Sequence, residues 1–136
     1  MKIVIRGTDI ARCTVGIQVP GAPWHAVTYA ARPEEYLAIL QRHLQEAGVN
    51  IADVQGIVVI AGEGSATAVR ASVTLANVLA WTHGWTVEEI AIPAEATEEE
   101  MGEAVKRAVR VRVARPQYQH APHITQSTHD VLKRKL

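Results

Sequence analysis

Apolar and polar positions divide the first thirty residues into three short runs separated by turn residues. The runs cover residues 2–5, 13–19 and 24–31, and a Pro-Gly-Ala-Pro turn separates the last two. Short apolar or alternating runs bounded by turns are typical of β-strands, and strands joined by tight turns pair antiparallel. The pattern therefore predicts an antiparallel meander of three strands.

The segments that follow alternate between helical and strand patterns. Pro33 stands at the first position of a helix, apolar residues then recur at three- and four-residue steps, and Gly48 ends the helix. Residues 56–62 form a continuous branched-aliphatic run, which indicates a strand covered on both faces. Residues 85–93 predict a further strand. We therefore expect a strand–helix–strand unit around the helix between them.

The C-terminal part begins with a third helix. Thr97 and Glu100 have the spacing of a capping box, and apolar residues continue the helix to about Val109. Residues 109–113 then alternate strictly, as in a short strand, before the apolar content falls. We expect one domain over residues 1–115, followed by a basic tail over residues 116–136.

The order of these elements predicts an α/β fold. Three strands, a helix, a strand, a helix and a strand give a mixed sheet with an antiparallel three-strand meander and two main helices. This is the order of a ribonuclease H-like half-domain, the ASKHA-type unit from which sugar kinase, Hsp70 and actin lobes are built. Such a plan alone specifies no activity.

A glycine-bracketed turn at positions 62–65 leads into the second main helix. Glycines at a helix N-terminus can cradle a phosphate, but Glu63 would place a carboxylate in that cradle, and the spacing matches no phosphate-binding motif. We favour a tight corner that joins strand to helix, with Ser65 or Thr67 as the helix cap.

The helix after this turn is apolar around most of its circumference. Only Arg70, Thr74 and Asn77 form a narrow polar line. A helix of this kind must be covered on more than one side, so we expect either the first helix or another chain to cover what the sheet does not. The predicted partner-binding face consists of Tyr36, Leu37, Leu40, Leu44, Val69, Ser72, Val73, Leu75, Ala76, Leu79, Ala80 and Trp81.

Residues 48–85 resemble the central block of the TsaB family, also called YeaZ. The turn is similar to the family pattern GpGSfTGlRiG, with alanine in place of the usual aromatic residue and of a second small residue. Residues 2–19 occupy the position of the family's first hairpin. The matching turn residues are Gly62, Gly64, Ser65, Thr67 and Arg70, and a closing P-x-Y-x-R-x-P-x-I-T motif is matched by Pro116, Tyr118, Pro122, Ile124 and Thr125.

The resemblance implies a non-catalytic scaffold in the machinery that places threonylcarbamoyl on adenosine of tRNA (t6A modification). Family members bind the catalytic paralogue TsaD through a helical bundle built from the same two helices, and they can self-associate through that face. It also implies a short form without the family's second domain, with no catalytic, cofactor or metal residues. Arg6 stands where the family has an Asp, and Asp9 alone does not make a divalent-metal site.

Charge is balanced overall but unevenly distributed. There are 14 basic and 14 acidic residues, so net charge favours neither nucleic acid nor membrane. Five glutamates lie between positions 95 and 103, whereas basic residues dominate from position 106 onward. We expect Tyr118, Pro122 and Ile124 of the tail to contact a partner. The alternatives are contact between tRNA phosphates and residues 133–135, or a solvated extension of the domain.

Single residues narrow the remaining possibilities. One cysteine excludes an internal disulfide, and no signal peptide or long apolar run is present, so we expect a cytoplasmic protein that does not span a membrane. Cys13 is expected to be a small buried hydrophobe. His120 and His123 have metal-like spacing but lie in the tail, so a solvated pair is favoured. Trp85 is expected in the core, and Trp81 either in the core or at an interface.

Two other functions fit the pattern less closely. The first is a structural or regulatory homodimer that uses the helical face on itself. The second is a ribonuclease H-like nuclease or small phosphotransferase, which would need two or more convergent carboxylates for metal ions. The sequence does not distinguish a TsaD-like partner from a second copy of the chain.

Overall fold

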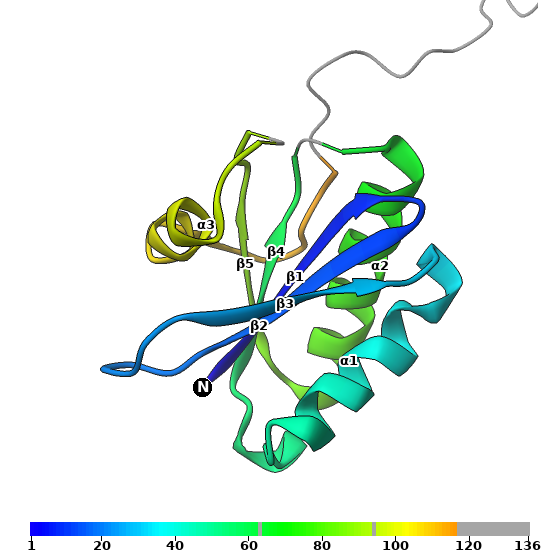
Figure 1. Ribbon diagram of the computed structural model, residues 1–136. Helices are drawn as coiled ribbons and strands as arrows, with labels where there is room; N and C mark the ends of the chain where they lie inside the picture. The colour runs from blue at the N-terminus through cyan, green and yellow to red at the C-terminus, as the bar shows by residue number, and fades with distance from the viewer. Residues whose placement is uncertain (63, 94, 117–136) are drawn as a thin grey trace, which may run out of the picture.

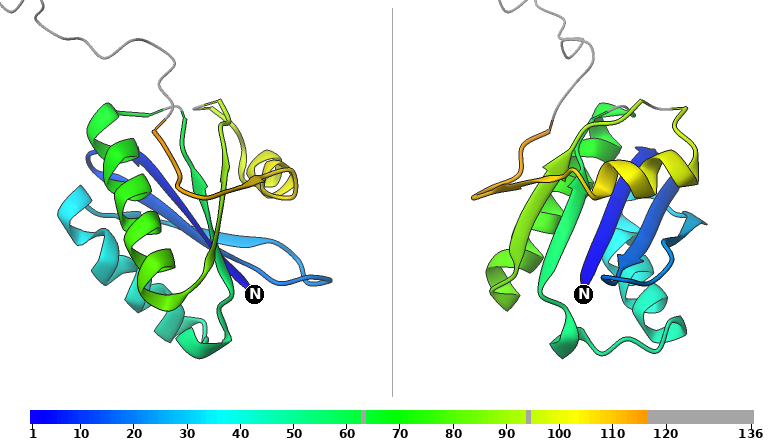
Figure 2. Two further views of the ribbon diagram at one scale, coloured as in Figure 1. Left: turned by 180° about the vertical axis from the view of Figure 1, so that it is seen from behind. Right: turned by 90° about the vertical axis from the view of Figure 1, so that its left-hand side faces the viewer.

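A computed structural model describes residues 1–62, 64–93 and 95–116, and it shows one six-stranded sheet with helices on both faces (Figure 1; Figure 2). None of the helices in these ranges is long and apolar enough to cross a membrane. The strands are β1 (Lys2–Asp9), β2 (Arg12–Gln18), β3 (His25–Ala30), β4 (Gly56–Ile60), β5 (Thr86–Ile90) and β6 (Val109–Val111). The helices are α1 (Tyr36–Glu46), α2 (Ala66–His83) and α3 (Glu98–Val105), with 3-10 turns η1 (Pro33–Glu35) and η2 (Ile51–Asp53).

The strands lie in the order β3-β2-β1-β4-β5-β6. β1, β2 and β3 pair antiparallel, as the meander predicted. β4 is parallel to both β1 and β5, so the chain must cross over through α2 between β4 and β5. β6 closes the far edge antiparallel to β5. The mixed α/β sheet expected from the element order is confirmed.

The helices divide the molecule into three layers. α1 and α2 cover one face of the sheet and α3 covers the other (Figure 2). Alternate residues of the central strands point to opposite faces, so Ile57 and Val59 pack in the core under α1 and α2, whereas Val58 and Ile60 pack under α3. All residues of β4 are buried, as predicted for a strand covered on both faces.

Element boundaries follow local capping and tertiary pairing. The Thr97 side chain accepts a hydrogen bond from the Glu100 amide (3.1 Å), so the predicted capping box at the start of α3 is confirmed. α3 ends at Val105, earlier than expected, because the chain turns back to pair β6 with β5. β1 runs to Asp9, four residues beyond the predicted strand, because β2 continues to pair with it past Arg6.

A partly buried polar contact joins edge strand β3 to α1. The Tyr29 hydroxyl lies 2.7 Å from Nδ1 of His43, and the two rings meet edge to face. Glu46 accepts a hydrogen bond from Arg42 (2.8 Å) beside them. His43 is only 4% exposed, and its burial lowers its pKa; the nearby His25 lowers it further, whereas Glu46 acts in the opposite direction.

This contact predicts a pH-dependent stability. Because the pKa of His43 is lower in the folded chain than in the unfolded chain, the unfolded chain binds more protons once the pH falls below about 6.5. The free energy of unfolding, measured by urea titration, is therefore expected to decrease from pH 7.5 to pH 5.5. The decrease should be smaller in His43→Gln and unchanged in His83→Gln, which alters an exposed histidine. Equal slopes in all three proteins would contradict the assignment.

Candidate partner-binding site

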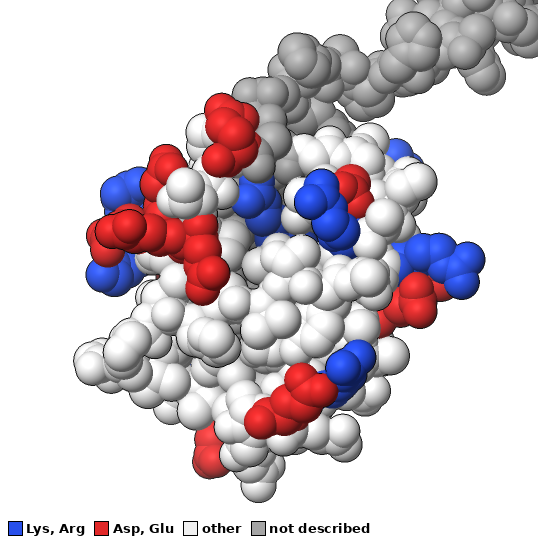
Figure 3. Space-filling view, in the orientation of Figure 1, with Lys and Arg blue, Asp and Glu red and all other residues white. Residues whose placement is uncertain are grey.

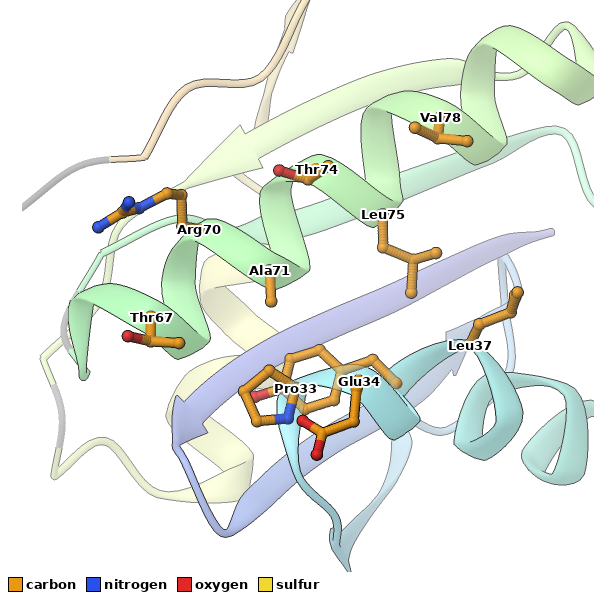
Figure 4. Close-up of a pocket in the computed structure, with 10 residues that line it drawn as sticks. Pro33, Glu34, Leu37, Thr67, Arg70, Ala71, Thr74, Leu75 and Val78 are labelled. Atoms are coloured by element: carbon orange, nitrogen blue, oxygen red, sulfur yellow. The ribbon is translucent and has the colours of Figure 1, made fainter.

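An open groove lies between η1 and α1 on one side and α2 on the other (Figure 4). Its volume is about 510 Å³, and apolar or small side chains form most of its lining. Leu75 extends from α2 toward the side of α1, and Leu37 lies on the α1 wall. The lining residues are Pro33, Glu34, Tyr36, Leu37, Thr67, Arg70, Ala71, Thr74, Leu75 and Val78.

The structure places most of the interface residues expected from the sequence in the core, and their role in binding stays a prediction. Nine of the twelve are buried within the chain itself, and of these nine only Tyr36 also lines the groove. The apolar face that α1 and α2 turn toward the sheet holds these residues. The nine are Tyr36, Leu40, Leu44, Val69, Ser72, Val73, Ala76, Leu79 and Ala80. Only Leu37, Leu75 and Trp81 lie at the surface.

Surface residues of α2 that the sequence analysis did not assign to an interface complete the groove wall. Val78 is 53% exposed, and Ala71 and Thr67 line the groove beside it. A signal for them was present in the sequence, because the predicted polar line of Arg70 and Thr74 marks the outward side of the helix, and its immediate neighbours must share that side.

Asn77, the third residue of the predicted polar line, has a structural role and does not line the groove. Asn77 donates from Nδ2 to the Ala114 carbonyl (2.9 Å), and the Ala114 amide donates to Oδ1 of Asn77 (2.9 Å). The next amide, that of Arg115, donates to Glu89 (3.0 Å). These bonds attach the segment after β6 to α2 and β5.

The two tryptophans near the end of α2 differ sharply in exposure. Trp81 is 88% exposed, one helical turn beyond Val78. Trp85 packs against the core and stacks on His83, with ring centroids 4.7 Å apart. The prediction for Trp85 is confirmed, and Trp81 lies on the surface. An exposed indole next to Val78 extends the apolar surface beyond the groove.

The glycine turn at the start of α2 is a corner packed against the first hairpin. Gly64 has φ +150°, and a Cβ atom there would lie 2.6 Å from the Thr8 carbonyl oxygen. The Ser65 amide donates to the same oxygen (3.3 Å), and the Ser65 side chain accepts from the Ala68 amide (3.0 Å). The predicted corner and its Ser65 cap are confirmed.

The side chains of the first hairpin engage one another and the backbone. Arg6 is 5% exposed and donates to the Pro93 carbonyl (2.9 Å). The Asp9 carboxylate accepts from Arg12 Nε (2.9 Å) and Nη2 (2.7 Å) and from the Ala11 amide (2.8 Å). The hydrogen bond from the Arg12 side chain is the main cause of the lowered pKa of Asp9. Within the described ranges, no three His, Cys, Asp or Glu side chains lie close enough to hold a metal ion.

Cys13 on β2 is fully buried, and this burial raises its pKa to about 12. The interpretation as a small hydrophobe is confirmed, because a thiol with so high a pKa is not a nucleophile at neutral pH. The expected tail contacts at Tyr118, Pro122 and Ile124, and the histidine pair at 120 and 123, lie outside the described residues.

Acidic side chains gather over α3, on the other face of the sheet from the groove. On the face seen in Figure 3, acidic side chains cluster over α3, with a few basic ones beside them. The first turn of α3 supplies Glu98, Glu99 and Glu100, where negative charge stabilises a helix N-terminus. The predicted concentration of acids before position 104 therefore lies on the opposite side of the sheet from the groove.

Comparisons with known proteins agree with this architecture. A family model described as TsaD, tRNA N6-adenosine threonylcarbamoyltransferase, matches residues 30–92, which include both walls of the groove. YeaZ from Pseudomonas aeruginosa aligns with a TM-score of 0.58 at 20% identity, over 66% of this chain and 43% of that chain. A structure titled as an uncharacterized protein with similarity to peptidase YeaZ, from the same organism, gives the same TM-score, identity and coverage of this chain, with 42% of its own length aligned. No curated protein matches the sequence.

The chain has an α/β ribonuclease H-like fold, as the order of its elements predicted. The resemblance to the TsaB/YeaZ family is confirmed by the TsaD family model and the two YeaZ structures. The alignment spans less than half of either YeaZ chain.

The corner at Gly64 gives a stability prediction with a matched control. Gly64→Ala combines a strained φ with a close approach to Thr8, and is expected to destabilise the fold by about 2–4 kcal/mol. Gly21→Ala also has positive φ but open space around it, so its cost should be near 1 kcal/mol. Urea unfolding measures both. Equal costs would mean that the corner is not tightly packed.

Proposed function

We propose that the protein is a TsaB-like, non-catalytic subunit of the t6A machinery that docks a TsaD-like paralogue on the groove between α1 and α2. The observation that carries the proposal is this apolar groove. The sheet is already covered by the buried sides of α1 and α2. The exposed apolar residues of the groove wall are therefore not needed to cover it. The TsaD family model matches residues 30–92, which include both walls of the groove.

The exposed apolar side chains around the groove are those that commonly anchor protein interfaces. Leu37 is 44% exposed, Val78 53% and Trp81 88%. Contiguous apolar surface on an otherwise polar protein commonly marks an interaction site, and tryptophan is enriched among residues whose truncation costs the most binding energy. A docked helix would remove these side chains from water.

The first hairpin supports a non-catalytic role. Metal-dependent ribonuclease H-like enzymes need convergent carboxylates to hold their ions. In this chain β1 buries Arg6 at the position where the TsaB family has an aspartate. The Asp9 carboxylate accepts hydrogen bonds from Arg12. A guanidinium beside the site would oppose a divalent cation. These residues favour a scaffold over a nuclease or phosphotransferase.

The basic tail fits the same proposal in one of two ways. Tyr118, Pro122 and Ile124 would contact the paralogue, or the lysines and arginine at 133–135 would contact tRNA phosphates. Phosphate contacts weaken steeply with salt, so the salt dependence of tRNA binding by the complex separates the two. A role in tRNA modification would place the protein in the cytoplasm.

Substitution at the groove tests the docking proposal. Leu75→Glu places a charge on the groove wall at a half-buried position and is expected to weaken binding to the TsaD-like paralogue of the same genome more than about tenfold. Val109→Glu changes a 64% exposed residue on β6 and should leave binding intact. Co-purification and isothermal calorimetry provide the measurement.

Three outcomes would contradict this proposal. If Leu75→Glu binds the paralogue like the unmodified protein, the groove is not the docking surface. If the paralogue does not bind, and light scattering instead shows a dimer that Leu75→Glu dissociates, the groove serves self-association. Metal-dependent turnover of RNA or a nucleotide that is lost in Asp9→Ala would favour the enzyme alternative.

A further inference from the structure

A second groove lies on the other face of the sheet, between the β2–β3 connection and α3, and we call it the α3 groove. Its volume is about 750 Å³. The β2–β3 connection forms an apolar wall with Val19, Pro20, Pro23 and Trp24, and Val19 is 37% exposed. A Cβ atom at Gly102 would lie 2.8 Å from the Trp24 ring. The ring therefore rests directly on the backbone of α3.

The wall that α3 contributes is acidic (Figure 3). Glu98, Glu99 and Glu103 line the groove, and Lys106 is the basic residue among its lining residues. Lys106 pairs with Glu103 (3.0 Å). Within the part of the chain that the structure describes, Glu98 and Glu99 form no ion pair. Three carboxylates against one ammonium group leave two negative charges in the groove.

Basic residues of the first hairpin lie close to this wall without neutralising it. Arg6 and Arg12 line an adjacent pocket of about 190 Å³ that also includes Glu98. Arg12 pairs with Asp9, and Arg6 donates to the Pro93 carbonyl. Neither guanidinium forms an ion pair with Glu98. The surplus of negative charge on the α3 wall therefore remains.

The chain carries a segment of matching chemistry outside the described residues. Residues 131–136 read Val-Leu-Lys-Arg-Lys-Leu, so apolar residues flank three basic ones. Opposite charges that face each other across a contact favour association, and apolar side chains gain by covering exposed apolar surface. The segment can therefore satisfy both walls of the α3 groove at once, the acidic one and the apolar one.

The tail is long enough to bring this segment to the groove. Hydrogen bonds from Ala114 to Asn77 and from Arg115 to Glu89 fix the place where the tail leaves the domain. The 17 residues from 117 to 133 can extend over about 55 Å. The six strands of the sheet together span only about 24 Å. Length therefore does not prevent the tail from passing round the edge of the sheet.

We infer that residues 131–136 dock in the α3 groove of the same chain, with Lys133, Arg134 and Lys135 facing the carboxylates of α3. The inference does not rest on the proposed docking of a paralogue, which concerns the opposite face of the sheet. Exposed ion pairs are individually weak, but a tethered segment has an effective concentration of about 1 mM. The contact therefore forms within one chain and is weak enough to be released by salt.

Docking within the chain occupies the basic residues that contact with tRNA would need. Phosphates would have to displace the α3 carboxylates before Lys133, Arg134 and Lys135 could bind them. Residues 117–125 precede the docked segment and stay available to a paralogue. The negative charge of α3 then serves to hold the end of the chain away from other anions.

A spin label on the tail tests this inference in the full chain. Thr128→Cys provides the attachment point, because Cys13 is buried and its pKa is raised to about 12. Paramagnetic broadening of the NMR signals is measured on the backbone amides of α3 and on the indole N–H of Trp24. At about 50 mM salt we expect these signals to lose about half of their intensity, and at about 500 mM salt to regain most of it.

Charge reversals locate the contact. Lys133→Glu/Arg134→Glu/Lys135→Glu should abolish the broadening on α3, and it changes no residue of the described domain. Glu99→Lys/Glu103→Lys should abolish it as well, and the two reversals combined should restore it. Glu34→Lys/Glu35→Lys is the matched control, because it reverses two exposed acids of η1 that share Arg32. This control should leave the broadening unchanged.

Several results would overturn the inference. They are absence of broadening on α3, broadening that survives the tail reversal, and broadening that falls on the α1–α2 groove instead. A mixed sample, in which spin-labelled chains broaden α3 of other chains more than their own, would assign the groove to the tail of a second copy.

The docking of a paralogue is tested separately by Leu75→Glu, which should leave the broadening on α3 unchanged. Loss of the broadening in Leu75→Glu would also overturn the inference.

Discussion

The burial of strand β4 on both faces is the constraint on which the rest of the structure depends. Every side chain of this strand is excluded from water, and its residues alternate between two separate cores. Each large aliphatic side chain buried in this way contributes about 1.5–3 kcal/mol. One helical layer therefore has to lie on each face, and α2 is held against β1 and β4 by this requirement.

That position explains why α2 is apolar around most of its surface. Val69, Val73 and Ala76 face the sheet and are buried by it. Leu75 and Val78 face the groove that α2 shares with η1 and α1. The same helix thus has a structural side and an exposed apolar side. The docking proposal concerns only the exposed apolar side. This side is a narrow strip of the α2 surface.

The order and type of the elements could be predicted from the sequence because each carries a local signal. The continuous apolar run of β4, the capping box at Thr97 and the glycines around α2 all depend on neighbouring residues. β1 was predicted too short, because Arg6 interrupts its apolar pattern and only pairing with β2 extends it. The link between Tyr29 and His43 and that between Asn77 and Ala114 join distant segments, so no local pattern indicates them.

The site was predicted less completely than the fold, for a related reason. Periodicity identified the apolar residues of the two helices but did not show which of them the sheet would cover. Leu40 and Ala76 proved to be core, whereas Val78 and Arg70 lie on the groove wall. In a helix with a narrow polar line, the side facing the core depends on packing against strands that are distant in sequence.

The depth at which Cys13 is buried makes the chain well suited to site-specific labelling. A thiol with a pKa of about 12 is ionised in fewer than about one molecule in ten thousand at neutral pH. Maleimide dyes would therefore leave the native cysteine unmodified in the folded chain. A cysteine introduced at an exposed position such as Trp81 would take up the dye alone, without prior removal of Cys13 from the core.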